Sequence, residues 1–165
     1  MAEASSRRRE MNAFDRAIER VAATRAGGWY FVNVVSKIDP WILRRSDGRW
    51  STSIGQPVLL VEHVGAKSGA SRETALVYAL DGDAILLVAS KAGAPKNPGW
   101  YHNLKANPEC GIIAKDRSGR YRARELEGEE RERAWAIVTD VYRGYATYQT
   151  RTGGRVIPVL RLDRI

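Results

Sequence analysis

The stretch from Pro57 to Ala89 constrains the fold most, because three strand-like segments follow one another with only tight turns between them. The first and third are apolar runs, and the second alternates between two phases, as residues on the two faces of a sheet do. Parallel strands need a crossover of a dozen or more residues, and these turns are far too short for one. We therefore expect an antiparallel meander whose strands are residues 57–64, 72–80 and 84–89.

The rest of the chain continues this close spacing. Three more strand-like segments follow, and Pro158 in the last indicates an edge strand, because proline cannot donate to a neighbouring strand. Two segments with helical periodicity lie among them. The expected fold is mainly β with helices (α+β), a split β-barrel or small closed barrel of about six antiparallel strands. The further strands are expected at 109–115, 120–127 and 155–162, and the helices at 99–106 and 129–142.

Residues 1–50 are predicted to form an N-terminal helical segment ahead of a barrel domain at residues 51–165. Glu10–Thr24 has apolar residues at helical spacing. The stretch Trp29–Leu43 is rich in apolar residues, interrupted by Pro40 and flanked by cations. It fits two interpretations: a helix packed on the core, or a mobile helix at a membrane surface with its tryptophans at headgroup level.

The sequence excludes several classes of protein. No apolar run approaches the roughly 20 residues of a membrane span, and the N-terminus lacks the apolar core of a secretory signal. We therefore expect a cytoplasmic protein, free or peripheral at the inner face of the membrane. Cys110 is the single cysteine, which excludes an internal disulfide and a cysteine-rich zinc site. The two histidines are too few for a multi-histidine site, so no metal is expected.

The net charge of +8 lies at the two ends of the chain. Residues 1–49 and 111–165 carry +4 each, whereas residues 50–110 are neutral. A nucleic-acid-binding domain usually concentrates its charge on one surface that carries a recognisable motif. The chain has no zinc-finger spacing, no RNP-like run and no glycine-arginine repeat. We therefore expect no nucleic-acid partner.

The run Ser90–Pro108, SKAGAPKNPGWYHNLKANP, is the most informative motif. It follows a buried strand and leads through a glycine-containing turn into a helix. Asn97 is placed to cap this helix, with Pro98 at the first helical position. Free N–H groups and the positive end of the helix dipole gather at such a helix start. The motif therefore fits an anion-binding loop, although many similar loops bind nothing.

Three cations lie beside turns in the neutral centre of the chain: Lys67, Arg72 and Lys91. In a three-stranded meander, the end of the first strand lies beside the start of the second, and the third strand ends at the same edge. The three side chains are therefore expected to meet at one end of the sheet. A phosphate there would gain charge-assisted hydrogen bonds and a bidentate arginine. The alternative is three solvated turn residues.

Tyr142, Tyr145 and Tyr148 recur at a spacing of three, which keeps them near one face if the preceding helix continues past Gly144. Rings beside a cleft can stack on a planar ligand and offer a hydroxyl. Simple core packing is the alternative. The chain has no defensible Ser-His-Asp, paired-carboxylate or dinucleotide signature, so a bound cofactor would carry the chemistry of an enzyme built this way.

Several motifs together resemble the deazaflavin-dependent nitroreductase family, the F420H2-dependent quinone and nitroimidazole reductases of actinobacteria. They are GAKSGASR, the DGD turn, LLVASKAGAPKNPGWYHNLKANPE and YRGYATYQ, within about residues 35–160. The resemblance implies a split β-barrel that binds coenzyme F420, an 8-hydroxy-5-deazaflavin. It further implies hydride transfer from the reduced coenzyme to a small hydrophobic acceptor, such as a quinone, nitroaromatic or activated enone, and an N-terminal segment near substrate or membrane.

The same resemblance implies roles for individual residues. The cations that would hold the phosphate are Lys67, Arg72 and Lys91. The residues that would line or support the deazaflavin are Ser90, Ala92, Gly93, Ala94, Trp100 and Asn103. The tyrosines that would surround the substrate pocket are Tyr142, Tyr145 and Tyr148. One of them, Tyr145 or a neighbour, would donate a hydrogen bond or proton to the acceptor.

Two positions depart from the family pattern. Ala66 stands where members usually have the arginine of GRKSG, and Thr74-Ala75 stands near a usual proline. The first departure removes one contact to the coenzyme's phosphate or tail. Two other functions stay open on the same barrel: an FMN-dependent oxidoreductase, and a protein that binds F420 without turnover.

Overall fold

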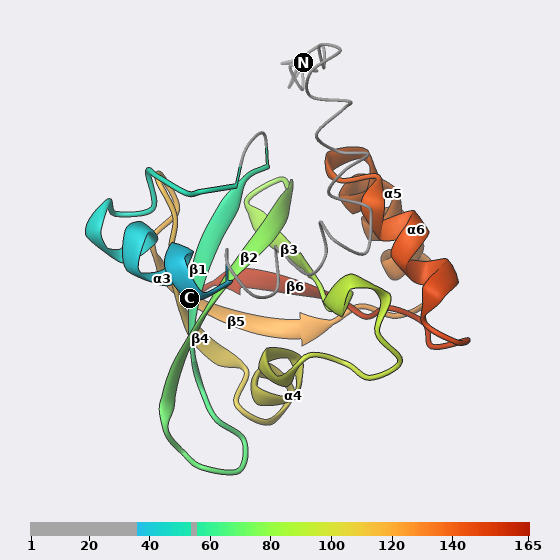
Figure 1. The fold of residues 1–165 in the computed structure, drawn as a ribbon, viewed down its shortest axis with the longest axis horizontal. Helices are drawn as coiled ribbons and strands as arrows, with labels where there is room; N and C mark the ends of the chain where they lie inside the picture. Colours follow the sequence, from blue (N-terminus) through green and yellow to red (C-terminus); the bar gives the residue numbers. More distant parts are fainter. Residues whose placement is uncertain (1–35, 54–55) are drawn as a thin grey trace.

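The computed structural model describes residues 36–53 and 56–165. Its centre is a closed barrel of antiparallel strands in the order β1-β2-β3-β6-β5-β4, with β4 pairing back to β1 (Figure 1). The expected barrel of six antiparallel strands is thereby confirmed. The strands are β1 (Val58–Val64), β2 (Ser71–Asp81), β3 (Ala84–Val88), β4 (Glu109–Ile113), β5 (Gly119–Glu125) and β6 (Val159–Arg164).

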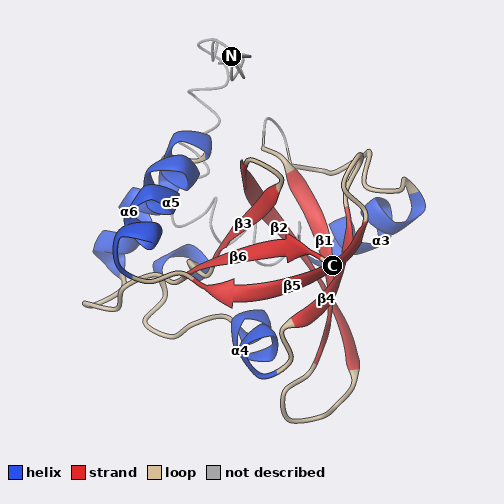
Figure 2. Ribbon diagram, turned by 180° about the vertical axis from the view of Figure 1, so that it is seen from behind, coloured by secondary structure: helices blue, strands red, loops and turns tan. Residues whose placement is uncertain are grey.

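Helices cover the barrel on separate sides. Figures 1 and 2 both place α5 and α6 together on one side of the barrel and α3 on the opposite side. No helix in the described part is long and apolar enough to cross a membrane. The helices are α3 (Ser36–Arg45), the short 3-10 helix η2 (Lys91–Gly93), α4 (Gly99–Ala106), α5 (Gly128–Val141) and α6 (Gly144–Arg151).

The sequence of β3 is apolar without alternation, and its burial gives the reason. All five of its residues are buried. Ile85 and Leu87 belong to the core cluster that contains Leu59 and Trp100, whereas Leu86 packs in the cluster beneath α5 and α6. Both faces of β3 are therefore covered, and neither phase of the strand needs a polar side chain.

The expectation that the last strand is an edge strand is wrong. β6 pairs with β3 on one side and with β5 on the other, so it is internal to the closed barrel. Pro158 directly precedes β6, a position where the N–H that proline lacks is tolerated. Its carbonyl accepts a hydrogen bond from Ala89 N at 2.9 Å. The proline therefore marks the start of the strand, which is the other position that proline tolerates.

Helix α3 is fixed to the barrel by three kinds of contact, and it contains Pro40. Leu43 is fully buried among residues of β1 and β2. Arg44 forms ion pairs with Glu62 and Glu73 on those strands. Asp39 is buried and accepts hydrogen bonds from the segment that follows α3. Within the described part of Trp29–Leu43, Leu43 is therefore packed on the barrel, whereas Trp41 is exposed. Residues 29–35 and the expected helix at 10–24 lie outside the described residues.

Candidate functional site

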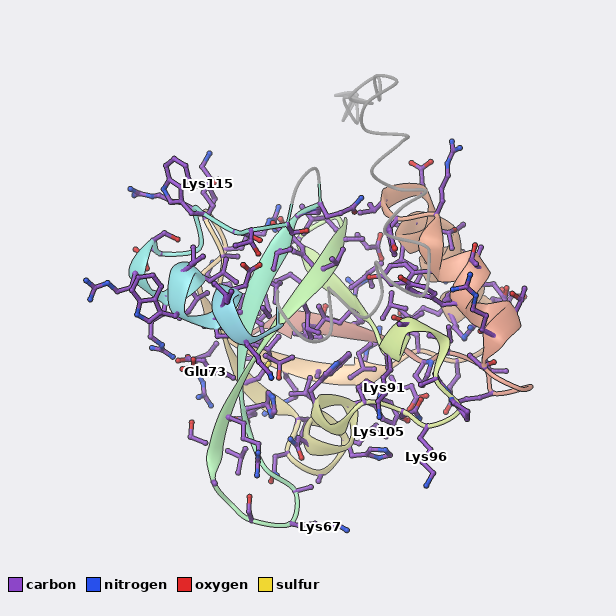
Figure 3. The ribbon with its side chains drawn as sticks, in the orientation of Figure 1. Lys67, Glu73, Lys91, Lys96, Lys105 and Lys115 are labelled. Carbon is purple, nitrogen blue, oxygen red and sulfur yellow. The ribbon has the colours of Figure 1, made fainter. Side chains whose placement is uncertain are left out.

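The turn between β1 and β2 carries Lys67 at the tip of a long hairpin (Figure 3). Gly65 begins this turn, and its N–H donates to Ala70 O at 2.8 Å. A Cβ on Gly65 would lie 2.6 Å from the Ser68 hydroxyl and 3.0 Å from Arg72 Nε, so a larger residue would push both side chains aside. The Arg72 side chain therefore lies against Gly65, the first residue of the turn.

Asn103, on α4, ties this turn to the barrel. Its Oδ1 accepts a hydrogen bond from Ala66 N at 2.9 Å, and its Nδ2 lies 3.1 Å from His63 Nδ1. The other ring nitrogen of His63, Nε2, lies 3.0 Å from Thr74 Oγ1 on β2. The contact at Ala66 uses only the backbone N–H of this residue, so it does not depend on the Ala66 side chain. A helix and two strands are thus joined through one histidine.

The hydrogen bonds of His63 determine its tautomer and charge. Ala66 N–H can only donate, so the Asn103 oxygen must face it and the Asn103 amide nitrogen must face His63. That nitrogen only donates, so His63 Nδ1 accepts and the proton sits on Nε2. Burial, and next the positive charge of Arg72, lower the pKa of His63. The ring is therefore neutral near pH 7.

The loop after β3, residues 89–97, is called the strand-end loop below. Three successive residues in it have left-handed backbone angles: Lys91 at φ 48°, Ala92 at φ 53° and Gly93 at φ 82°. Such angles cost an L-residue about 1–2 kcal/mol each. A conformation of this kind persists only where the surrounding contacts enforce it, and such places cluster at functional sites.

Gly93 brings the strand-end loop against α6. A Cβ on Gly93 would lie 2.9 Å from Tyr148 O and 2.9 Å from Arg151 Cβ, so a side chain there would collide with the helix backbone. The close approach places Lys91 and its neighbours beside the helix that carries Tyr145 and Tyr148. The sequence predicted both features, and the structure brings them together.

Arg155 holds the strand-end loop, and the sequence analysis missed this residue. Its guanidinium donates to Ala89 O at 3.2 Å, to Ser90 O at 3.0 Å, to Ala94 O at 2.8 and 3.2 Å, and to Asn97 Oδ1 at 2.6 Å. No carboxylate in the described residues pairs with it. No local pattern announces such a residue, because its partners lie 58–66 positions earlier in the chain.

Helix α4 has the predicted bounds but not the predicted cap. Pro98 occupies the N-cap position, and no side-chain hydrogen bond caps the helix. Asn97 instead accepts the hydrogen bond from Arg155. Trp100 is buried in the main core cluster, which is a supporting position under the loops and not an exposed one.

The tyrosines form one buried cluster. Tyr142 is the C-cap residue directly after α5, whereas Tyr145 and Tyr148 lie on α6, which begins at Gly144. The Tyr142 and Tyr148 hydroxyls lie 3.0 Å apart. Tyr145 packs edge-on against Tyr142, with ring centroids 5.0 Å apart. Burial raises the pKa of Tyr145, so its hydroxyl stays protonated and can donate. All three rings are buried in the cluster beneath α5 and α6.

The cations do not meet at one point, contrary to expectation. The turn with Lys67 follows Val64, which pairs with Ser71 at the start of β2. The loop with Lys91 follows β3, whose Leu87 pairs with Tyr78, seven residues later on β2. Figure 3 accordingly shows Lys67 at the hairpin tip and Lys91 apart from it, near the barrel. The cations form an extended row instead of a cluster.

No other reactive centre is evident within the described ranges. No group of three or more metal-ligating side chains occurs there. Cys110 is buried, and burial raises the pKa of its thiol to about 11. The thiol is therefore protonated and inert near neutral pH. The candidate site consists of the hairpin turn, the strand-end loop and the tyrosine cluster.

Comparison with known proteins gives one consistent result. A family model described as F420H(2)-dependent quinone reductase matches residues 35–163. An F420H(2)-dependent quinone reductase of Mycobacterium tuberculosis is 43% identical over 128 residues, which cover 74% of this chain and 85% of that protein.

Two solved structures are similar to this chain. One, described as the F420-H2 dependent reductase FDR-A, is 44% identical, covers 65% of this chain and 94% of that chain, and superposes with a TM-score of 0.60. Another, described as a domain-swapped dimer, is 36% identical, covers 75% of this chain and 98% of that chain, and has a TM-score of 0.61.

Proposed function

Because the chain belongs to the F420H2-dependent quinone reductase family, we propose that it is an oxidoreductase that uses coenzyme F420 to reduce a quinone. The observation that carries the proposal is the family match over residues 35–163, which spans the hairpin turn, the strand-end loop and the tyrosine cluster. The reduced deazaflavin, when bound, supplies a hydride, so nitroaromatics and activated enones are further plausible acceptors. The protein supplies binding, orientation and electrostatics.

The row of cations fits an elongated anion such as this coenzyme, which carries a phosphate and a polyglutamate tail. Lys67, Arg72 and Lys91 have no carboxylate partner within the described residues, so their charge is available to a ligand. Arg72 and Lys67 on the hairpin would hold one end of the anionic chain, and Lys91 would hold the part nearest the ring. A protein cation and a phosphate or carboxylate form the stronger, charge-assisted kind of hydrogen bond.

The strand-end loop would line the deazaflavin ring through Ser90, Ala92, Gly93 and Ala94. Three of these residues have no side chain beyond Cβ, so a planar ring can approach the backbone closely. Below this loop, Trp100 is packed in the core, and Asn103 holds the hairpin turn. These two would act as supports and would not touch the ring.

The tyrosine cluster would face the acceptor. Tyr145 is the best candidate donor, because its hydroxyl has no hydrogen-bond partner among the described residues and stays protonated. The Tyr142 and Tyr148 hydroxyls already contact each other. A phenol that donates to the acceptor oxygen would stabilise the negative charge that develops there on reduction.

One experiment separates this proposal from its alternatives. Purified protein is titrated with F420 and with FMN in parallel, and the F420H2 complex is then mixed with menadione while the absorbance of oxidised coenzyme is followed. Binding of F420 with reappearance of the oxidised chromophore is expected. Tight FMN binding in its place would identify a flavin enzyme. F420 binding without oxidation by menadione or a nitroaromatic would identify a carrier protein.

Peripheral membrane binding is the second part of the proposal. Trp41 and Trp50 are 66% and 72% exposed, Arg45 stacks over Trp41, and Arg49 lies in the same shallow hollow of about 540 Å³. Exposed tryptophans beside cations suit the headgroup region of an anionic bilayer. Co-sedimentation with vesicles of anionic lipid, absent with neutral lipid and lost in Trp41→Ala/Trp50→Ala, is expected. Equal sedimentation of the natural chain and the double variant would contradict membrane binding through these tryptophans.

A further inference from the structure

We propose that Arg155 is the positioning residue of the coenzyme loop: it holds the strand-end loop in its left-handed conformation before the coenzyme binds, and it ties that loop to α6. The identity of the ligand rests on the proposed function. The geometry of the loop does not.

The first argument is backbone strain. Lys91 and Ala92 hold φ angles of 48° and 53°, and glycine is absent at both positions. The hydrogen bonds inside the turn are two, from Gly93 N to Ser90 O and from Ala94 N to Lys91 O, each 3.0 Å long. Two ordinary turn bonds are a weak restraint on two strained residues. Arg155 adds five more hydrogen bonds, and all of them end on this loop.

The second argument is the choice of partners. Arg161, six positions later, pairs with the carboxylates of Asp81 and Asp163, as an arginine that ties the surface together usually does. Arg155 has only carbonyl and amide acceptors, which do not neutralise it. Its charge therefore remains available beside Ser90 and Lys91, where an anionic ligand is expected. Burial lowers the pKa of Arg155, but a guanidinium stays protonated.

The third argument is the link to the tyrosines. The carbonyl oxygen of Arg155 accepts hydrogen bonds from Gln149 Nε2 and Thr152 Oγ1, each 2.7 Å long. Gln149 lies on α6, one residue after Tyr148. The backbone of Arg155 is thus fixed to the helix of the tyrosine cluster, while its side chain is fixed to the strand-end loop. The residue sets the distance between the two sides of the site.

The test compares Arg155→Gln and Arg155→Lys with Arg161→Gln, a matched arginine on β6 outside the site. Hydrogen exchange is measured on the full chain without coenzyme, and F420 affinity is then measured by titration. The amides of Gly93 and Ala94 are expected to exchange at least tenfold faster in both Arg155 variants, with β1 amides unchanged. F420 affinity is expected to fall at least tenfold in both. Arg161→Gln should change neither measurement.

Lysine is the informative substitution, because it keeps the charge but cannot reach four separate acceptors from one ammonium. Wild-type exchange and affinity in Arg155→Lys would overturn the inference, since charge alone would then suffice. Equal acceleration of β1 and loop amides would also overturn it, since Arg155 would then stabilise the whole fold. If the wild-type chain itself binds no F420, the proposed function fails, and the exchange data still decide the role of Arg155 in the loop.

Discussion

Replacing Asn103, which holds the hairpin turn, with aspartate should reverse the effect of pH on the stability of the folded chain. Asn103 donates to His63 Nδ1 and accepts from Ala66 N. Aspartate has the same shape and keeps the contact to Ala66, but its second oxygen can only accept. Two acceptors would then face each other across 3.1 Å unless His63 carries a proton on Nδ1. The negative charge of the aspartate also stabilises a positively charged ring, so the variant should favour the charged imidazole that the natural chain disfavours.

The size of the effect follows from the contacts. A carboxylate in direct contact moves a neighbouring pKa by about 1–3 units. In the natural chain burial lowers the pKa of His63, so the folded state should lose stability as pH falls below about 6.5, the value of an unperturbed histidine. In Asn103→Asp the pKa should exceed that value, so stability should instead be gained in acid and lost as pH rises. The two proteins should therefore have opposite slopes of melting temperature between about pH 5 and 7.

Asn103→Leu tests the hydrogen bonds of Asn103 to His63 and Ala66 without adding charge. It removes two hydrogen bonds worth about 1 kcal/mol each. For a chain of this size, a loss of about 2 kcal/mol lowers the melting temperature by about 4–8 °C. The same loss would free the hairpin turn, so F420 affinity should also fall.

The chain suits this assay because it contains only two histidines. A proton–carbon NMR titration of the imidazole Cε1–H groups gives two signals, and His102→Gln assigns them. The pKa of His63 should lie below the ordinary value of a histidine in the natural chain and above its own natural value in Asn103→Asp. A His63 pKa in Asn103→Asp that equals the natural one, or identical melting slopes in the two proteins, would refute the hydrogen bond between Asn103 and His63.

Three further predictions concern the site. Lys67→Ala and Lys91→Ala should each weaken F420 binding about tenfold or more, because a charge-assisted contact contributes about 1.5–3 kcal/mol; calorimetric titration measures this, and Lys115→Ala, near α3, is the control that should bind normally. Tyr145→Phe should lower kcat for menadione with unchanged F420 affinity, and equal kcat would leave the ring as packing only. Cys110 should not react with a thiol reagent at pH 8 until the protein is unfolded, because burial raises its pKa to about 11.

Local signals in the sequence were enough to predict most of the fold. The DGD turn and the short link after Val64 leave antiparallel pairing as the only option for β1, β2 and β3. The place of β6 was not predictable in this way. It depends on closure with β3 and β5, far away in sequence, and Pro158 is compatible with an edge strand or a strand start. Long-range pairing decides between the two.

The site was predictable only where a motif or turn marks it. Lys67 and Lys91 are next to glycine turns, and their separation depends on β2 being longer than β3, which residue types do not reveal. The alternation of β1 did contain a signal for His63. It has the same phase as Leu59 and Val61, which places its ring on the inward face of the strand. Arg155 had no such signal, because one more arginine in a basic C-terminal region looks like solvated charge.

The charge of the site also differs from what the sequence total suggests. Residues 50–110 have no net charge, but their carboxylates are used by arginines from outside the segment. Those pairs are Glu62 and Glu73 with Arg44, Asp81 with Arg161, Asp83 with Arg117, and Glu109 with Arg120 and Arg122.

The cations of the same segment mostly have no ion pair. Lys105 pairs with Glu125, which lies outside the segment. In the described part of residues 50–110, the cations left without a carboxylate are Lys67, Arg72, Lys91 and Lys96. Charges farther apart than about 8–10 Å are largely screened at physiological salt, so an approaching anion responds to these neighbours and not to the sum over the segment. A stretch with zero net charge can therefore present the most attractive surface of the protein to an elongated anion.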